Sequence, residues 1–130
     1  MEFNKNQPIY LQIADLICEK ILLLLWKEGE RIPSVREFAV TIQVNPNTVM
    51  RTYTFLQEEG IITNQRGIGF FVTGGGLKSA KTFITKQVIE TDMQNLFKKM
   101  DLLGITLYEL NKYYEESKDK FSGEGNENNQ

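Results

Sequence analysis

The chain of 130 residues contains no histidine and only one cysteine, Cys18. The absence of histidine removes the most common general base, the most common metal ligand and the usual sensor of physiological pH. A single cysteine cannot form a disulfide within the chain, and zinc or redox sites built from cysteine pairs are excluded. We therefore expect no metal site, no cofactor and no catalytic residue.

Long hydrophobic segments are also missing. The longest apolar run, Ile21–Trp26, has six residues, whereas a membrane-spanning helix needs about 20. The N-terminal residues lack the charged and then apolar layout of a signal peptide. These absences predict a reduced, soluble, cytoplasmic protein without a membrane partner.

A strong net charge is the third absence, since 15 basic and 17 acidic side chains give a formal charge of -2. Bulk electrostatics alone therefore do not indicate nucleic acid. The stretch 38–57 is more informative, because it contains one arginine and no acidic residue. Such a surface tolerates a polyanion, although acid-free stretches of this length also arise by chance.

Helix signals dominate the first part of the chain. Apolar residues at spacings of three and four predict a helix over 8–26, and they cover a wide arc that indicates more than one packing neighbour. Ser34 and Glu37 have the spacing of a capping box, in which each side chain binds a free backbone amide at a helix start. A short helix over 35–42 is expected after this box.

The next helix signal starts with Asn45, an N-cap residue type, followed by Pro46 at the first helical position. An apolar stripe follows, and Gly60 is typical of a C-terminal stop. We expect a third helix over 46–59.

The spacing then changes to a β pattern. The β-prone triplets 61–63 and 70–72 are joined by a segment with two glycines, which predicts a hairpin. Residues 1–73 are expected to form one domain that ends with this hairpin.

The remainder of the chain is predicted to be helical. A glycine linker is expected over 74–77, followed by a helical segment over 78–121 with helices at about 80–100 and 106–118. The tail 122–130 is rich in Gly, Asn and Glu and is expected to be disordered.

This order of elements predicts a mostly α fold with a small β-hairpin, namely a winged helix-turn-helix followed by a two-helix C-terminal segment. In a helix-turn-helix, the later helix enters the major groove of DNA. Its N-terminal end would present Asn45, Asn47 and Thr48, with Arg51 one turn further on. These side chains are able to reach base edges or phosphate oxygens.

Two further arginines fit this interpretation. Arg66 in the hairpin loop would place a cation in a minor groove, and Arg36 at the start of the second helix would meet the DNA backbone. Each side chain also has a simpler explanation: Asn45 as a helix cap, Thr48 as a solvent-facing residue, and the arginines as solvated charges or partners of nearby acids such as Glu37.

Five blocks of sequence together resemble the DNA-binding domain of GntR-family bacterial transcription regulators. They lie in order between residues 8 and 72: Pro8–Ile13, Gly29–Glu37, Val44–Val49 with Arg51, Tyr53 and Leu56, Glu59–Ile62, and Arg66–Val72. The resemblance implies DNA contacts from the matching positions, which are Arg36, Asn45, Asn47, Thr48, Arg51, Arg66, Gly67 and Gly69. Two positions depart from the family pattern. Gln43 stands where glycine is usual in the turn, and Ile68 stands in the wing where a basic or small polar residue is common.

The length of the chain after the wing indicates the subfamily. Effector-sensing members carry a large ligand domain there, whereas only 54 residues follow Gly76 (130 − 76). The chain resembles the short YtrA type, which implies dimerisation through two C-terminal helices and a link to a transporter operon. Two apolar helices without a domain of their own also need a partner surface, for which a second copy is the simplest candidate. Packing of these helices against the first helix of the same chain is the alternative.

We therefore predict a homodimeric regulator, most simply a repressor, that binds an inverted-repeat operator in double-stranded DNA. A protein-interaction module that uses the winged fold without DNA is the rival from another class, and the near-neutral charge favours it. An enzyme is remote, because the adjacent Glu58 and Glu59 point to different sides of a helix and cannot act as an acid and base pair. An unidentified small-molecule effector bound at a dimer interface stays open.

Overall fold

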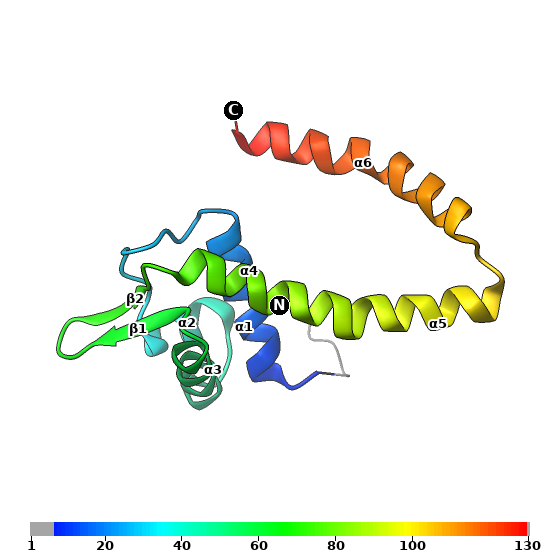
Figure 1. Cartoon of the computed structure of the whole chain (residues 1–130). Coiled ribbons are helices and arrows are strands. Elements are labelled where there is room, and N and C mark those ends of the chain that lie inside the picture. The colour runs from blue at the N-terminus through cyan, green and yellow to red at the C-terminus, as the bar shows by residue number, and fades with distance from the viewer. Residues whose placement is uncertain (1–6, 130) are drawn as a thin grey trace. The chain divides into compact units, whose positions relative to one another are not determined.

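The computed structural model describes the backbone of residues 7–129 and the side chains of residues 7–121. The chain divides into two units, Met1–Gln87 and Val88–Gln130. The expected fold class is confirmed, because the described residues are mostly helical and contain one antiparallel pair of strands (Figure 1). Within this part of the chain, no helix is long and apolar enough to span a bilayer.

The first unit has the element order of a winged helix-turn-helix. Its elements are α1 (Ile9–Leu22), α2 (Val35–Ile42), α3 (Pro46–Glu58), β1 (Ile62–Gln65), β2 (Gly69–Val72) and α4 (Gly76–Gln87). The bounds of α2 are those predicted from its capping box, and α3 ends one residue earlier than predicted. Local signals at the helix starts therefore located these two elements well.

The turn between α2 and α3 contains the departure noted at Gln43. This residue has φ 57° and ψ 52°, which is the left-handed region. A side chain there costs conformational energy that glycine avoids. The turn therefore forms without glycine, and Gln43 adopts the left-handed conformation at a cost in conformational energy.

The core of the first unit is centred on α1, which packs against both α3 and α4. This arrangement explains the wide apolar arc of the α1 sequence. Cys18 is one of the buried α1 residues, and burial, followed by the charges of Asp15 and Glu59, raises the pKa of its thiol to about 12. Cys18 is therefore a neutral core residue at physiological pH.

The predicted end of α1 near residue 26 is wrong, because the helix ends at Leu22. Leu24 has φ 61°, and the amides of Leu25 and Trp26 both bond back to the carbonyl of Lys20. The reversal brings the Trp26 ring onto Phe38, with ring centres 5.4 Å apart. The apolar pattern continued through the leucines, but this tertiary contact turned the chain earlier.

The wing is the β1–β2 hairpin, in which Ile62 pairs with Val72 and Gln65 pairs with Gly69. A third backbone segment extends it, since Arg31 forms a bridge with Phe71 and the Ile32 amide donates to the Phe70 carbonyl at 2.9 Å. The hairpin is therefore attached to the loop before α2 rather than standing alone.

The predicted glycine linker over 74–77 is only partly correct, because α4 begins at Gly76. Gly76 is buried, and a Cβ added there would lie 2.7 Å from Val72 Cγ1 and 2.8 Å from the Ile61 carbonyl oxygen. Glycine serves close packing at this position rather than flexibility. The first unit accordingly extends through Gln87 instead of ending near residue 73.

The alternative of packing within the chain holds for α4. Ala80 is fully buried, and three further apolar side chains of α4 pack on the core: Leu77, Phe83 and Ile84. The predicted helix over 80–100 is also interrupted, because a π-helical turn, η1 (Val88–Asp92), separates α4 from α5.

The second unit consists of η1, α5 (Met93–Leu103) and α6 (Leu107–Asn129). Gly104 ends α5 with φ 70°, and Thr106 and Glu109 form reciprocal hydrogen bonds at the start of α6. The helix continues beyond its predicted end near 118. The expected disorder of 122–130 is not what the described backbone contains, because α6 is helical through Asn129; the side chains of 122–130 lie outside the described part of the structure.

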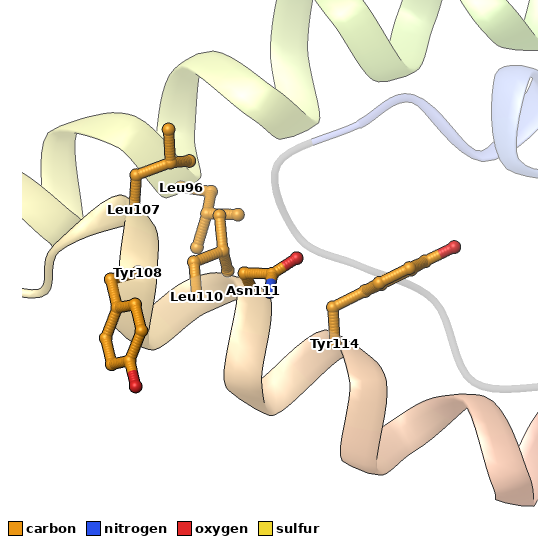
Figure 2. Close-up of a pocket in the computed structure, with 6 residues that line it drawn as sticks. All are labelled: Leu96, Leu107, Tyr108, Leu110, Asn111 and Tyr114. Carbon is orange, nitrogen blue, oxygen red and sulfur yellow. The ribbon is translucent and has the colours of Figure 1, made fainter.

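An open, apolar groove runs between α5 and α6 (Figure 2). Its volume is about 710 Å³, and its lining residues are Leu96, Leu107, Tyr108, Leu110, Asn111 and Tyr114. The two helices form this groove without enclosing a cavity.

Candidate nucleic-acid interface

The candidate interface begins at the N-terminus of α3. Asn45 is the N-cap, and its Oδ1 accepts a hydrogen bond of 2.8 Å from the Asn47 amide. The capping explanation for Asn45 is therefore confirmed. Capping uses the side-chain oxygen only, so the exposed Asn45 still has its amide N–H groups to offer to a ligand.

The structure brings Asn47, Thr48 and Arg51 together on one shallow concave surface. The N-terminal end of α1 completes it with Pro8, Ile9 and Tyr10, and the volume of the hollow is about 320 Å³. Asn47 and Arg51 are exposed and Thr48 is half-buried. Three of the residues predicted from the sequence thus form a contiguous polar surface at the start of α3.

Arg51 is held at this surface by an aromatic ring. Its guanidinium carbon lies 3.9 Å from the centre of the Tyr10 ring. Among residues 7–121, no carboxylate forms an ion pair with Arg51. The alternative explanation, that Arg51 is the ion-pair partner of a nearby acidic residue, is therefore wrong for the described side chains.

The opposite face of α3 fixes the helix to the core. The hydroxyl of Thr52, which is fully buried, donates to the Tyr10 carbonyl at 2.8 Å. The Tyr53 hydroxyl donates to the Pro33 carbonyl at 2.6 Å, and the Tyr53 ring packs against Phe70. The orientation of the exposed face is consequently set by directional bonds on the buried face.

Tyr53 keeps its proton at any physiological pH. Burial is the main cause that raises the pKa of Tyr53, and the charge of Glu37 adds to it. The hydroxyl therefore stays a hydrogen-bond donor to Pro33.

Arg36 lies exposed in the first turn of α2. The neighbouring Glu37 is occupied by the capping box: its Oε1 accepts from the Ser34 amide at 3.2 Å, and its own amide donates to Ser34 Oγ at 3.1 Å. The Ser34 hydroxyl and amide bonds hold the pKa of Glu37 below its ordinary value. Glu37 is thus engaged locally, and Arg36 forms no ion pair with it in the described residues.

The hairpin loop carries Arg66, Gly67 and Ile68, all exposed. Gly67 has φ 79°, which suits glycine in a tight turn. Gly69 has φ 145°, and a Cβ there would lie 2.8 Å from Arg31 Nε. Both glycines are therefore required by the shape of the wing.

The structure does not place Arg36 or Arg66 on the concave surface at α3. These two arginines lie on α2 and in the wing loop of the same unit. Among the described residues, no group of His, Cys, Asp or Glu could hold a metal ion.

Sequence reasoning missed two side chains next to the predicted site. Tyr10 stacks on Arg51, and Arg31 packs its guanidinium beside Gly69 in the wing. Neither has a local sequence signal, because each is brought to its partner by the tertiary fold. Tyr10 lies in the first turn of α1, and the helix signal there gave no indication of a contact 41 residues further along the chain.

Comparisons with known proteins agree with this geometry. Residues 9–72 match the family model described as bacterial regulatory proteins, gntR family. The HTH-type transcriptional regulator YhcF of Bacillus subtilis is 37% identical over 111 residues, which cover 84% of this chain and 88% of that protein. The HTH-type transcriptional repressor YtrA of the same organism is 35% identical over 116 residues, covering 87% and 86% of the two chains.

Solved structures give the same result. A GntR-family transcriptional regulator from Listeria monocytogenes superimposes with a TM-score of 0.72 and 31% identity, covering 88% of this chain and 98% of that chain. The family and the long matches are to transcriptional regulators and not to enzymes. The chain therefore belongs to the GntR family of bacterial transcriptional regulators and is a DNA-binding regulator.

Proposed function

We propose that the protein is a homodimeric repressor that binds an inverted-repeat operator, with one α3 helix reading each half-site. The observation that carries this proposal is the polar surface of Asn47, Thr48 and Arg51 at the start of α3, opposite the buried face of the helix. A helix N-terminus with short polar side chains fits the major groove.

The contacts divide into two kinds. Arg36 in α2, Arg51 in α3 and Arg66 in the wing loop are exposed cations of the first unit, and they would supply phosphate contacts and most of the affinity. Asn47 and Thr48 would supply much of the sequence preference through base edges.

The wing has a smaller share in this proposal. Gly67 and Gly69 shape the loop, and Arg66 would enter a minor groove. Ile68, which is 57% exposed at the tip, offers no hydrogen bond to DNA. Arg66 is thus the single polar anchor that the loop contributes.

Dimerisation through the second unit is supported by its exposed apolar side chains. Leu102, Leu107 and Tyr108 are 83%, 76% and 80% exposed, and Leu96 lines the open groove with the last two. Monomeric proteins rarely leave such a surface uncovered, and a second copy would cover the same surface on both chains. The same groove is where an unidentified apolar effector would bind.

The direction of regulation and the target are proposed by analogy with relatives. YtrA of Bacillus subtilis is named a transcriptional repressor, and the resemblance to its subfamily implies the operon of a transporter. We propose both for this protein, together with a cytoplasmic location.

Fluorescence anisotropy tests the proposal. The purified protein is titrated onto a duplex of its own upstream promoter and onto a scrambled duplex, each at two salt concentrations. We expect tighter binding to the promoter duplex and weakening of both by salt, because phosphate contacts release counterions. Equal, salt-independent binding to both duplexes would contradict the proposal and favour the rival, a winged-helix module that binds protein, which the formal charge of -2 supports.

A further inference from the structure

The Tyr10 ring lies between the first unit's core and the exposed face of α3. On one side, the Arg51 guanidinium carbon is 3.9 Å from the ring centre. On another side, Phe55 packs edge-on, with ring centres 6.0 Å apart. The Tyr10 backbone is also fixed, because its carbonyl accepts the hydrogen bond of 2.8 Å from Thr52.

We propose that Tyr10 is a positioning residue for DNA binding, which holds the Arg51 guanidinium in one orientation on the α3 surface. This inference rests on the proposed role of Arg51 as a DNA contact. Tyr10 acts through Arg51 and is not itself assigned a contact to DNA.

The chemistry of arginine explains why such support has an effect. Its side chain is long and loses rotamer freedom when it binds, whereas a guanidinium already stacked on a ring loses less. Stacking uses the face of the guanidinium and leaves its N–H edges available for two parallel hydrogen bonds to phosphate oxygens. No carboxylate in residues 7–121 forms an ion pair that competes for those edges.

The aromatic contacts of Tyr10 extend to α4. Phe55, which packs against Tyr10, is half-buried and contacts Phe83 of α4 edge-on, with ring centres 5.4 Å apart. Arg51 therefore stands on an aromatic stack that is continuous with the core of the first unit. An arginine at an unsupported helix position would have no such fixed direction.

Four variants test the inference: Tyr10→Leu, Tyr10→Phe, Arg51→Ala and the double variant Tyr10→Leu/Arg51→Ala. Dissociation constants on the promoter duplex, and their salt dependence, are measured for each beside the wild-type protein. We expect Tyr10→Leu to weaken binding by about two- to fivefold, the range of an exposed cation–π contact. Tyr10→Phe keeps the ring and is expected to bind like the wild type.

The double variant separates positioning from other roles. If Tyr10 works through Arg51, Tyr10→Leu causes no further loss once Arg51 is alanine. An equal loss in both backgrounds would overturn the inference, and so would a loss in Tyr10→Phe, which would assign the contact to the hydroxyl. Should Tyr10→Leu fail to fold in a thermal melt, Tyr10→Met fills the same space flexibly and carries the same expectation.

Failure of the proposed function has a different signature. If the wild-type protein binds neither duplex, the function proposed above is wrong. If it binds with salt dependence and Tyr10→Leu binds equally well, the DNA-binding proposal stands and the positioning role is wrong.

Discussion

Individual residues of α3 divide the helix into a buried face and an exposed polar face, which is the face proposed to bind DNA. Thr52 and Tyr53 are fully buried and donate hydrogen bonds to backbone carbonyls of other segments. Asn47 and Arg51 are exposed, and Arg51 has no ion pair among the described side chains. Substitutions on the exposed face should therefore change DNA binding with little effect on stability.

Alanine substitutions of Arg51 and Asn47 are expected to change DNA binding in different ways. Arg51→Ala should weaken binding to the promoter and scrambled duplexes equally and reduce the salt slope by about one, as loss of one phosphate contact does. Asn47→Ala should reduce the preference for the promoter by about 1–3 kcal/mol, because a base-edge contact is lost. Anisotropy titrations on both duplexes measure these effects.

Lys81→Ala is the matched control for the arginine variant. Lys81 is an exposed cation on α4 of the same unit, so its loss changes the net charge equally. Its binding should stay close to that of the wild type. Unchanged affinity in Arg51→Ala would remove this residue from the interface.

Gln43 carries backbone strain that substitution should relieve. Its φ of 57° costs a side chain about 1–2 kcal/mol, and glycine adds an entropic cost of about 0.5–1 kcal/mol in the unfolded chain. Gln43→Gly should therefore stabilise the protein by about 0.5–1 kcal/mol in denaturant unfolding. Gln57→Gly, the same change within α3, should destabilise it; a destabilised Gln43→Gly would contradict the argument.

At the scale of elements, α4 depends on a glycine at its first position. A Cβ at Gly76 would meet Val72 Cγ1 at 2.7 Å and the Ile61 carbonyl at 2.8 Å. Gly76→Ala should therefore destabilise the first unit by about 1–3 kcal/mol, the usual cost of overpacking, as measured by thermal or denaturant unfolding. Gly74→Ala is the control, because nothing lies within 4 Å of its added Cβ; equal stability of both variants would show that α4 is not closely docked.

Elements with their own local signals were predictable, and those fixed by distant contacts were not. The capping box at Ser34 and Glu37 and the N-cap at Asn45 determine the starts of α2 and α3 within a few residues of sequence. The end of α1 and the start of α4 depend instead on Trp26 packing on Phe38 and on Gly76 packing on Val72. Periodicity carries no information about such contacts.

The same division applies to the candidate site. Asn47, Thr48 and Arg51 were identified because they follow a helix start, and the structure places them on one surface. Tyr10 and Arg31 were missed because their contacts with Arg51 and Gly69 join segments far apart in the chain. Local sequence thus predicts the polar side chains of the surface, whereas the tertiary contacts that position them depend on the fold.

For the whole molecule, the uneven distribution of acidic residues along the chain explains how a protein with a formal charge of -2 can bind DNA. The acid-free stretch 38–57 includes all of α3 except Glu58. Acidic residues are frequent in α6, where Glu109, Glu115 and Glu116 are exposed. In the proposed function, the charge that DNA meets is that of the first unit's α3 surface and not the average of the chain.

In the proposed function, operator binding depends on dimerisation, which is a property of the whole molecule. Leu107 is 76% exposed and lines the groove between α5 and α6, so Leu107→Glu should leave the fold of one chain intact while placing a charge in the predicted dimer surface. Sedimentation should then give the monomer mass of 15.0 kDa instead of twice that value.

The loss of dimerisation in Leu107→Glu should lower the affinity for the promoter duplex by about 10² or more, because the second half-site no longer binds as part of the same assembly. Asn95→Asp adds the same charge to an exposed polar position of α5 and should remain dimeric with unchanged affinity. A wild-type protein that sediments as a monomer, or a Leu107→Glu variant that stays dimeric, would show that this apolar surface has another occupant. A monomeric variant with wild-type affinity would show instead that one α3 helix is sufficient for recognition.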